Sequence, residues 1–461
     1  MKKLYLAAGL FAFTLVLNLT AYGDSAEVRR NWPQWRGPLA NGVAHEADPP
    51  LEWSETKNVK WKIKIPGAGN STPIVWGNQI FILTAVATGK KTEVKPAETP
   101  TPAPTDPPPG GERRRRGPDG PRRSEKPTDE HQFLVLCLDR NTGKTLWQKV
   151  ARQEVPHEGH QPNNTFASAS PITDGKLLFG FFGSRGLHVY DLGGNLKWTK
   201  DFGQMQTRNG FGEGASPALH GNTVVISWDD ETDNDFIVAL DKHDGKQLWK
   251  IPRHEDTTWS TPLIVEHGGK QQVIVSATSK VRSYDLATGR ELWACAGQTA
   301  NVIPSPVADA DTVYVTSGFR GSALYAITLG RTGDLTGTDA IRWSRNQNTP
   351  YVPSPLLVED LLYAIKVNSG ILSCFDKRTG QPHYEAERLD GIREIYASPV
   401  AARDRVYVLS RDGVCLALKN GPRLEILATN KLDDKTDASI ALAGKELFIR
   451  GRQSLYCIKN N

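Results

Sequence analysis

The 461-residue chain has only a small excess of charge of one sign, few cysteines and few long apolar runs. Its formal net charge is only +5. So small an excess excludes an overall charge designed for nucleic acid, and we expect no nucleic-acid partner. Only residues 4–19 form an apolar run of any length, so we expect no transmembrane segment in the mature chain.

The first 23 residues are typical of a signal peptide. Lys2-Lys3 precede the apolar run, and Ala21-Tyr22-Gly23 then offers small residues for cleavage. The run is short for a membrane anchor, which is the rival interpretation. Cleavage before Asp24 would remove both lysines and lower the formal net charge from +5 to +3, because residues 1–23 contain no acid. We expect a periplasmic or secreted protein.

Five cysteines are too few and too scattered for a disulfide framework. In an exported protein an odd number leaves at least one thiol unpaired, and no two cysteines are adjacent. Most lie inside apolar, strand-like runs, which favours buried free thiols. The positions are Cys137, Cys295, Cys374, Cys415 and Cys457.

What the chain does have is a repeat. A Ser/Thr-Pro pair followed by apolar residues recurs, and from the second copy onward the spacing is 41 to 49 residues when a degenerate last copy, Ser439-Ile440, is included. The copies begin at Thr72, Ser170, Ser216, Thr261, Ser305, Ser354 and Ser398.

A second signal follows in most units. It is an apolar strand, an Asp, a short turn that ends in Gly, and a Trp four residues after that Gly, as in Asp139…Gly143…Trp147. The sixth unit has Tyr384 at the Trp position, and the seventh has Glu425. The tryptophans of this register are Trp147, Trp198, Trp249, Trp293 and Trp343, with Trp61 matching them near the N-terminus.

The repeat length predicts the fold class. Each unit contains four short runs rich in β-branched and aromatic residues, and a unit of about 45 residues with four strands is the size of a propeller blade. We therefore expect an all-β, eight-bladed β-propeller of four-stranded blades over residues 60–461, after an entry segment at 24–59. The last unit has only three strands, and residues 60–65 supply the fourth, which closes the ring.

These motifs resemble a known family. Asp139 to Trp147 and Asp285 to Trp293 look like the tryptophan-docking repeats of PQQ-like (quinoprotein-type) eight-bladed propellers, and Trp32-Pro33-Gln34-Trp35-Arg36-Gly37-Pro38 is similar to the entry segment of exported bacterial members. The resemblance covers about 400 residues and is specific for the fold. It implies that each repeated Trp packs between neighbouring blades near the turn Gly.

Residues 89–131 interrupt blade one between its second and third strands. They hold ten of the thirty prolines and an Arg113–Arg116 run, with ten basic and eight acidic residues. Almost nothing in this insertion is apolar, so we expect it to be disordered or polyproline-like. It is either a tolerated, solvated loop or a contact for an anionic partner.

The loops that could hold a ligand are those between consecutive blades, because they converge on the central channel. They are rich in polar and aromatic residues. Trp259 and Tyr396 immediately precede inner strands and are expected to point toward the channel mouth. The candidate polar contacts are His160, Asn164, Arg208, Glu213, His254, Arg393 and Glu394. The alternative is that these side chains bond to loop backbone and hold the blades together.

Metal sites are disfavoured by the residue patterns. His157 and His160 have a common spacing and no predicted helix. The acidic loop at 229–235 lacks the Gly and distal Glu of an EF-hand, so a solvated turn is the preferred interpretation. The chain also lacks a Ser-nucleophile motif, a phosphate-binding Gly loop and a Cys-x-x-Cys pair.

Two functions remain. The first is an exported, non-catalytic propeller that binds or acts as a scaffold for a protein or envelope ligand. We expect such a protein to be monomeric and to need no cofactor. The resemblance extends to the scaffold subunit of outer-membrane protein assembly. The second is a PQQ- and Ca²⁺-dependent dehydrogenase or another propeller enzyme using the channel face. Dehydrogenases of this family pair a vicinal Cys-Cys disulfide with a Trp platform and Glu/Asn/Asp calcium ligands, and this chain has no Cys-Cys pair.

Overall fold

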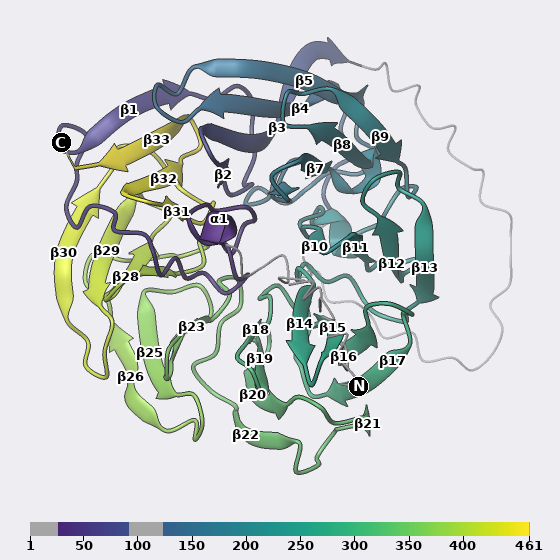
Figure 1. Cartoon of the computed structure of the whole chain (residues 1–461), viewed down its shortest axis with the longest axis vertical. Helices are drawn as coiled ribbons and strands as arrows, with labels where there is room; N and C mark the ends of the chain where they lie inside the picture. The colour runs from purple at the N-terminus through teal and green to yellow at the C-terminus, as the bar shows by residue number, and fades with distance from the viewer. Residues whose placement is uncertain (1–25, 92–122, 461) are drawn as a thin grey trace, which may run out of the picture.

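The computed structural model describes residues 26–91 and 123–460. The predicted signal peptide (1–23) and most of the predicted insertion lie outside these ranges. Within them the strands form eight sheets around a central axis (Figure 1). The other elements are the short helix α1 (Ala26–Arg29) and the 3-10 turns η2 (Gly183–Arg185) and η3 (Arg208–Gly210). The predicted all-β, eight-bladed propeller is confirmed.

The first four blades follow one order from the innermost strand to the outermost. Blade one consists of β2 (Ile74–Trp76), β3 (Gln79–Lys91), β4 (Asp129–Asp139) and β5 (Thr145–Glu154). Blade two consists of β6 (Ile172–Thr173), β7 (Leu177–Phe181), β8 (Leu187–Asp191) and β9 (Leu196–Lys200). Blade three consists of β10 (Ala218–His220), β11 (Thr223–Trp228), β12 (Phe236–Asp241) and β13 (Gln247–Pro252). Blade four consists of β14 (Leu263–His267), β15 (Lys270–Val275), β16 (Lys280–Asp285) and β17 (Glu291–Ala296).

The second half of the ring repeats this pattern. Blade five consists of β18 (Val307–Ala308), β19 (Thr312–Ser317), β20 (Ala323–Thr328) and β22 (Ile341–Arg345). Blade six consists of β23 (Leu356–Val358), β24 (Leu361–Ile365), β25 (Ile371–Asp376) and β26 (Pro382–Arg388). Blade seven consists of β27 (Val400–Ala402), β28 (Arg405–Leu409), β29 (Val414–Lys419) and β30 (Ile426–Lys431). Blade eight consists of β31 (Ala441–Ala443), β32 (Glu446–Arg450), β33 (Ser454–Lys459) and the N-terminal strand β1 (Val59–Lys64).

The two ends of the chain close the ring as predicted. β1 pairs antiparallel with β33, with Trp61 opposite Cys457 and Ile63 opposite Leu455. The closure hides the strand edges that an open last blade would expose. It makes blade eight depend on residues far apart in the sequence.

The core lies between the blades, because each sheet is covered on both faces by its neighbours. β19 and β32 are buried along their whole length, whereas the outermost strand β22 alternates between half-buried and exposed residues. Because the middle strands are buried on both faces, apolar residues follow one another along most of their length. All five cysteines are buried and unpaired, as expected.

Five of the six repeated tryptophans bind the next blade. Each indole Nε1 donates to a backbone carbonyl there at 2.8 to 3.0 Å. The turn Gly of that blade lies against the indole face; a Cβ on Gly245, for example, would lie 2.6 Å from Trp198. The pairs are Trp61 with Arg140, Trp147 with Leu192, Trp198 with Lys242, Trp249 with Leu286, and Trp343 with Lys377.

Trp293 departs from the arrangement that the family resemblance implies. Its Nε1 donates to the Gln272 side chain of its own blade at 3.1 Å. The reason is the longer turn of blade five, in which the short strand β21 (Gly333–Asp334) pairs in parallel with β17 and replaces the tight docking turn. Trp293 is nevertheless buried, in a core cluster that includes Leu335 and Ala340 of this turn, and no turn Gly lies against its indole.

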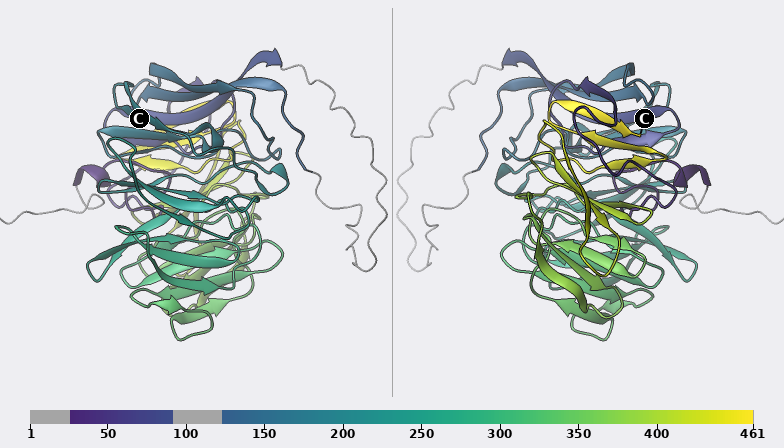
Figure 2. Two further views of the ribbon diagram at one scale, coloured as in Figure 1. Left: turned by 90° about the vertical axis from the view of Figure 1, so that its right-hand side faces the viewer. Right: turned by 90° about the vertical axis from the view of Figure 1, so that its left-hand side faces the viewer.

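The ring has two unlike faces, which Figure 2 shows in side view. The inter-blade loops share one face with the loops between second and third strands, since Glu231 N–H donates to Gln206 O across them. We call this the mouth face. The opposite face is crossed by the entry segment, residues 26–58, which forms bridges from Trp32 to Val75 and from Val43 to Ala401.

The predicted disorder of residues 89–131 is wrong at both ends of that range. β3 and β4 continue into the range, with Ala87 opposite His131 and Lys91 opposite Asp129. Backbone pairing with a facing strand orders these polar residues although they bury little apolar surface. Residues 92–122 lie outside the described part of the chain.

Candidate functional site

The Ser/Thr-Pro repeat forms a belt of hydrogen bonds around the channel. In the first seven copies the backbone N–H of the Ser or Thr donates to the hydroxyl of the equivalent residue in the next blade, at 2.9 to 3.1 Å. Seven such bonds link Thr72, Ser170, Ser216, Thr261, Ser305, Ser354, Ser398 and Ser439 in that order. The following Pro in the first seven copies has no N–H of its own, so it leaves no second donor to satisfy at this crowded point.

A cavity of about 210 Å³ lies inside this belt. Its wall is formed by the belt residues and by inter-blade loops of the mouth face, and Trp35 of the entry segment also lines it. Because the entry segment crosses the opposite face, Trp35 forms the floor and the cavity opens toward the mouth face.

Arg36 holds this floor in place. Its buried guanidinium donates to the carbonyls of Pro399 at 2.9 Å and Pro355 at 2.8 Å, immediately after two belt serines. Burial lowers the pKa of Arg36 to about 9, since no carboxylate compensates it. The entry segment is therefore fixed to blades six and seven by a charge that cannot be exposed without breaking these contacts.

Four aromatic side chains line the cavity wall. Trp259 is oriented by its Nε1, which donates to Gly212 O at 2.6 Å, and its ring lies 6.4 Å from that of Phe211. Tyr396 is covered on one side by the Arg411 guanidinium, 4.1 Å from the ring centroid. Tyr351 stacks on Phe319 at 5.1 Å. Trp259, Phe211, Tyr396 and Tyr351 all contribute to the cavity surface.

A polar network crosses the mouth from blade seven to the loop between blades one and two. Arg411 donates to Asp437 at 2.6 Å, to Glu394 at 2.8 Å and to the side-chain Oδ1 of Asn163 at 2.9 Å. Asn163 in turn donates to the Tyr396 hydroxyl at 2.9 Å. These bonds tie loops 248 residues apart in the sequence and fix the position of the Tyr396 ring.

The structure brings three of the nine predicted site residues into the cavity wall, namely Asn164, Trp259 and Tyr396. The Asn164 amide donates to Phe211 O and Glu213 O, so it also braces the neighbouring loop.

The other six predicted residues lie outside this cavity. Glu213 accepts hydrogen bonds from Ser184 and Arg185 of blade two, and His160 packs edge-on against Phe166. Glu394 belongs to the Arg411 network. The remaining three are on the mouth-face loops: Arg208 pairs with Asp256 at 3.2 Å, and His254 and Arg393 are exposed.

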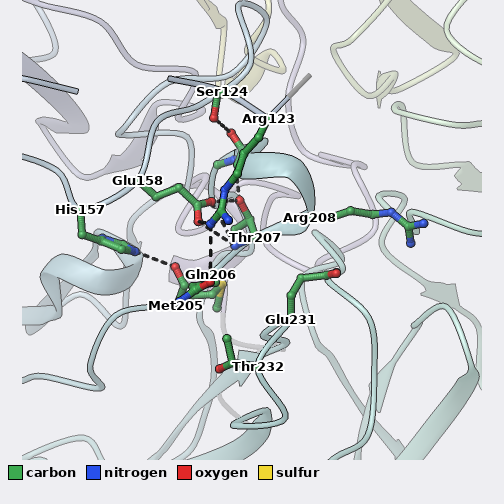
Figure 3. A network of polar contacts seen from close by, with 12 residues as sticks. Arg123, Ser124, His157, Glu158, Met205, Gln206, Thr207, Arg208, Glu231 and Thr232 are labelled. Atoms are coloured by element: carbon green, nitrogen blue, oxygen red, sulfur yellow. Dashed lines mark hydrogen bonds and ion pairs between the residues drawn. The ribbon is translucent and has the colours of Figure 1, made fainter. Parts of the chain in front are cut away.

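Figure 3 shows how the end of the insertion contacts the mouth face. Arg123 lies 3.4 Å from Glu158, and Ser124 donates to Gly210 O through its hydroxyl and to Asn209 O through its N–H. Glu158 is buried and accepts the Thr207 N–H at 3.0 Å. The loops that precede blades two and three are thus joined to each other and to residues 123–124.

The acidic loop at 229–235 is solvated at its tip, where residues 231–234 are exposed, but not at its two ends. Asp229, Asp230 and Asp235 are buried. Asp229 forms a fully buried ion pair with Arg253 at 2.7 Å, and Asp235 accepts the Glu255 N–H at 2.7 Å. Charged groups become buried here because partners from the next loop satisfy them, which local composition does not reveal.

Sequence reasoning missed the roles of Trp35, Arg411 and Asp437. Trp35 was visible as part of an entry motif, and its place on the channel floor depends on how that segment crosses the closed ring. Arg411 lies in the turn between β28 and β29, outside the inter-blade loops from which the candidates were taken. Only the tertiary fold brings it to Asp437 and Asn163.

The cavity does not fit a quinone cofactor with bound calcium. PQQ carries carboxylates and needs cations around it, yet no Lys, Arg or His side chain lines the cavity. Its single acid, Asp437, is already paired with Arg411 and Arg452. Across residues 26–91 and 123–460, no three His, Cys, Asp or Glu side chains are gathered as a metal site.

Comparison with known proteins agrees with the repeat analysis. A family profile described as outer membrane protein assembly factor BamB matches residues 131–385, more than half of the chain. No curated protein matches the sequence. Within the described residues no helix is long and apolar enough to cross a membrane.

Solved structures of two functional kinds are similar. BamB from Moraxella catarrhalis is 15% identical with a TM-score of 0.50, covering 71% of this chain and 91% of that one. The quinohemoprotein alcohol dehydrogenase from Comamonas testosteroni is 9% identical with a TM-score of 0.61, covering 94% and 81%. A europium-containing methanol dehydrogenase is 9% identical with a TM-score of 0.59, covering 94% and 98%. At these identities the similarity shows the fold alone.

Proposed function

This chain belongs to the outer membrane protein assembly factor BamB family, and from that premise we propose that it is a non-catalytic binding scaffold of the cell envelope. Its partner is a protein that docks on the mouth face. The protein is exported through the segment at residues 1–23, acts as a monomeric propeller in the periplasm or outside the cell, and needs no cofactor.

The observation that carries this proposal is the state of the polar groups in and around the cavity. The one carboxylate in the wall, Asp437, is held by two arginines at 2.6 and 2.7 Å. A general acid or base needs a titratable group that can exchange a proton with substrate. Asp437 accepts a hydrogen bond from each of these two guanidinium groups, so its oxygens are occupied by protein partners. The cavity wall therefore offers shape and hydrogen bonds rather than a free acid or base.

The exposed rim supports a protein partner. The mouth-face loops present the exposed side chains of His254, Asp256, Arg393 and Asp412 around the cavity. Charges of both signs on a rim are typical of protein interfaces, where they guide association. The ion pairs beneath them hold the loops in one geometry, which lowers the ordering cost of docking.

Titration with PQQ and Ca²⁺, followed by dye-linked oxidation of alcohols and sugars, tests the absence of catalysis. We expect no saturable cofactor binding and no turnover, since the wall supplies no cationic side chain and its one carboxylate is already paired with two arginines. Saturable binding with turnover would establish the dehydrogenase function instead.

Export is tested separately by cell fractionation and by N-terminal sequencing of the protein. The expected result is an envelope or secreted protein that begins at or near Asp24. A cytoplasmic protein that retains Lys2-Lys3 would contradict this part of the proposal.

A further inference from the structure

We propose that the central cavity is a binding site for one neutral sugar ring. This inference rests on the proposed role of the mouth face as a binding surface, and it names a small ligand for the cavity in addition to the protein partner on the rim.

The belt provides a ring of hydroxyl donors. Seven belt hydroxyls, from Ser170 round to Ser439, each accept a backbone N–H, which uses one side of the oxygen. Within the described chain none of these seven donates its own proton to a protein acceptor, and all seven line the cavity. A Ser or Thr hydroxyl carries one donor as well as its acceptor lone pairs. The cavity therefore offers several inward donors to a ligand that is rich in oxygen acceptors.

The aromatic side chains provide surfaces for the apolar face of such a ligand. Trp259 is fixed by its bond to Gly212, and Tyr396 has Arg411 on one side, which leaves its other side for the cavity. The two residues come from loops three blades apart, so a ring on the axis can meet an aromatic surface from more than one direction. Aromatic side chains with polar ends suit ligands that combine C–H faces with hydroxyl groups.

Amide groups complete the polar contacts. Gln161 lines the cavity, is half-buried, and its side-chain amide has no partner among the described residues. The carbonyl oxygen of the Asn70 side chain is likewise not used by any hydrogen bond in the described chain, although its amide donates to Asn163 O. Each amide can both donate to and accept from hydroxyl groups.

The charge of the wall favours a neutral ligand over an ion. No cationic side chain lines the cavity, and the carboxylate of Asp437 is compensated by Arg411 and Arg452. An anion or a cation would lose its hydration here without gaining an opposite free charge. The volume of about 210 Å³ lies below the roughly 300–1,000 Å³ of drug-sized sites, which fits a single ring.

The test is isothermal titration of the full protein with D-glucose, D-galactose and N-acetyl-D-glucosamine, and in separate arms with succinate and inorganic phosphate. We expect saturable one-to-one binding of at least one sugar, unchanged by added salt, and no binding of the two anions. Failure of all three sugars, or saturable binding of succinate or phosphate, would overturn the inference.

Two variants and a control locate the site. Trp259→Ala should weaken sugar binding by about tenfold or more, because it removes one stacking surface. Gln161→Ala should weaken it without affecting folding, since this amide has no protein partner among the described residues, and Gln247→Ala on the exposed outer strand should bind like wild type. Thermal unfolding of each variant separates lost binding from lost fold. Equal affinity of Gln161→Ala, Trp259→Ala and wild type would place the sugar elsewhere.

The two proposals fail in different ways. A protein that binds no sugar but still contacts a protein partner through the mouth face refutes only the sugar site. PQQ-dependent turnover refutes the scaffold function, whatever the outcome with sugars.

Discussion

The belt hydroxyls show how one residue type can serve structure and binding together. Seven belt oxygens each accept a backbone N–H from the preceding blade, so a hydroxyl lines the channel at these seven blade junctions as a consequence of holding the ring together. The Pro that follows suits this position because it brings no further N–H to satisfy.

Removal of one belt hydroxyl should destabilise the ring measurably. Ser305→Ala leaves the buried Thr261 N–H without its acceptor, which lies at 2.9 Å, and we expect a loss of about 1–3 kcal/mol in the free energy of unfolding. Ser305→Thr keeps the hydroxyl, and the chain itself uses Thr at positions 72 and 261. Denaturant unfolding should rank Thr close to wild type and Ala below it. Equal stability of the Ala and Thr variants would show that the belt bond contributes nothing.

The docking glycines allow backbone strain to be separated from packing. Gly245 and Gly269 have the same φ of +72°, but a Cβ at Gly245 would meet Trp198 at 2.6 Å, whereas a Cβ at Gly269 would have no atom within 4 Å. Both Ala variants lose stability because they place an L side chain at a positive φ. Only Gly245→Ala must also displace the Trp198 indole. We expect Gly245→Ala to be less stable than Gly269→Ala by about 1–3 kcal/mol. Identical unfolding midpoints and slopes for the two variants in denaturant would contradict the close packing of Trp198 against Gly245.

The residues that could be predicted are those whose role repeats along the chain. Trp198 and Gly245 belong to a motif with a fixed spacing, and that spacing reflects one packing interaction made many times. Arg411, Asp437 and Trp35 make contacts that occur once, between segments that only the closed ring brings together. Trp293 is buried in a core cluster with residues of blade five, as its motif predicts, but no turn Gly lies against its indole, because that blade has a different turn outside the motif of Trp293.

At the scale of elements, the junction of blades eight and one is the place where the ring closes. β1 and β33 come from opposite ends of the described chain, and Glu446 on β32 binds Lys60 of β1 at 2.8 Å and Arg140 of blade one at 2.6 Å. One buried carboxylate thus links three segments that separate when the ring opens.

This carboxylate should make ring stability depend on pH. Burial by itself would raise the pKa of Glu446, but its hydrogen bonds and ion pairs with Lys60 and Arg140 outweigh burial and lower it. A folded-state pKa below the unfolded value of about 4.3 means that the stabilisation is present above that pH and is lost as the pH falls through the folded pKa. The stability gap between wild type and Glu446→Gln should therefore be large at pH 7 and shrink in acid, as followed by tryptophan fluorescence in denaturant.

The control for this prediction is Glu425→Gln. Glu425 is exposed and pairs only with the exposed Lys419 at 3.6 Å, so its replacement should have little effect at either pH. A gap for Glu446→Gln that stays constant from pH 7 into acid would refute the electrostatic role of Glu446 at the ring closure.

At the scale of the whole molecule, the entry segment divides the propeller into a closed face and an open one. Trp35 and the buried Arg36 fix the floor of the channel, so a ligand in the cavity reaches it from the mouth face. The ends of β3 and β4 extend on the mouth side, and residues 123–124 contact the same loops (Figures 2 and 3). The opening of the cavity, the extension of β3 and β4 and the contacts of residues 123–124 therefore all lie on the mouth face.

The most direct test of the scaffold proposal is photo-crosslinking in living cells from defined positions on the two faces. A crosslinking residue is placed at His254 or Arg393 on the mouth face, and at Lys144 or Lys246 in exposed turns on the opposite face. We predict that both mouth-face positions capture the same discrete protein and that neither opposite-face position does. Capture only from Lys144 or Lys246, or no discrete product from any of the four positions, would contradict the scaffold proposal.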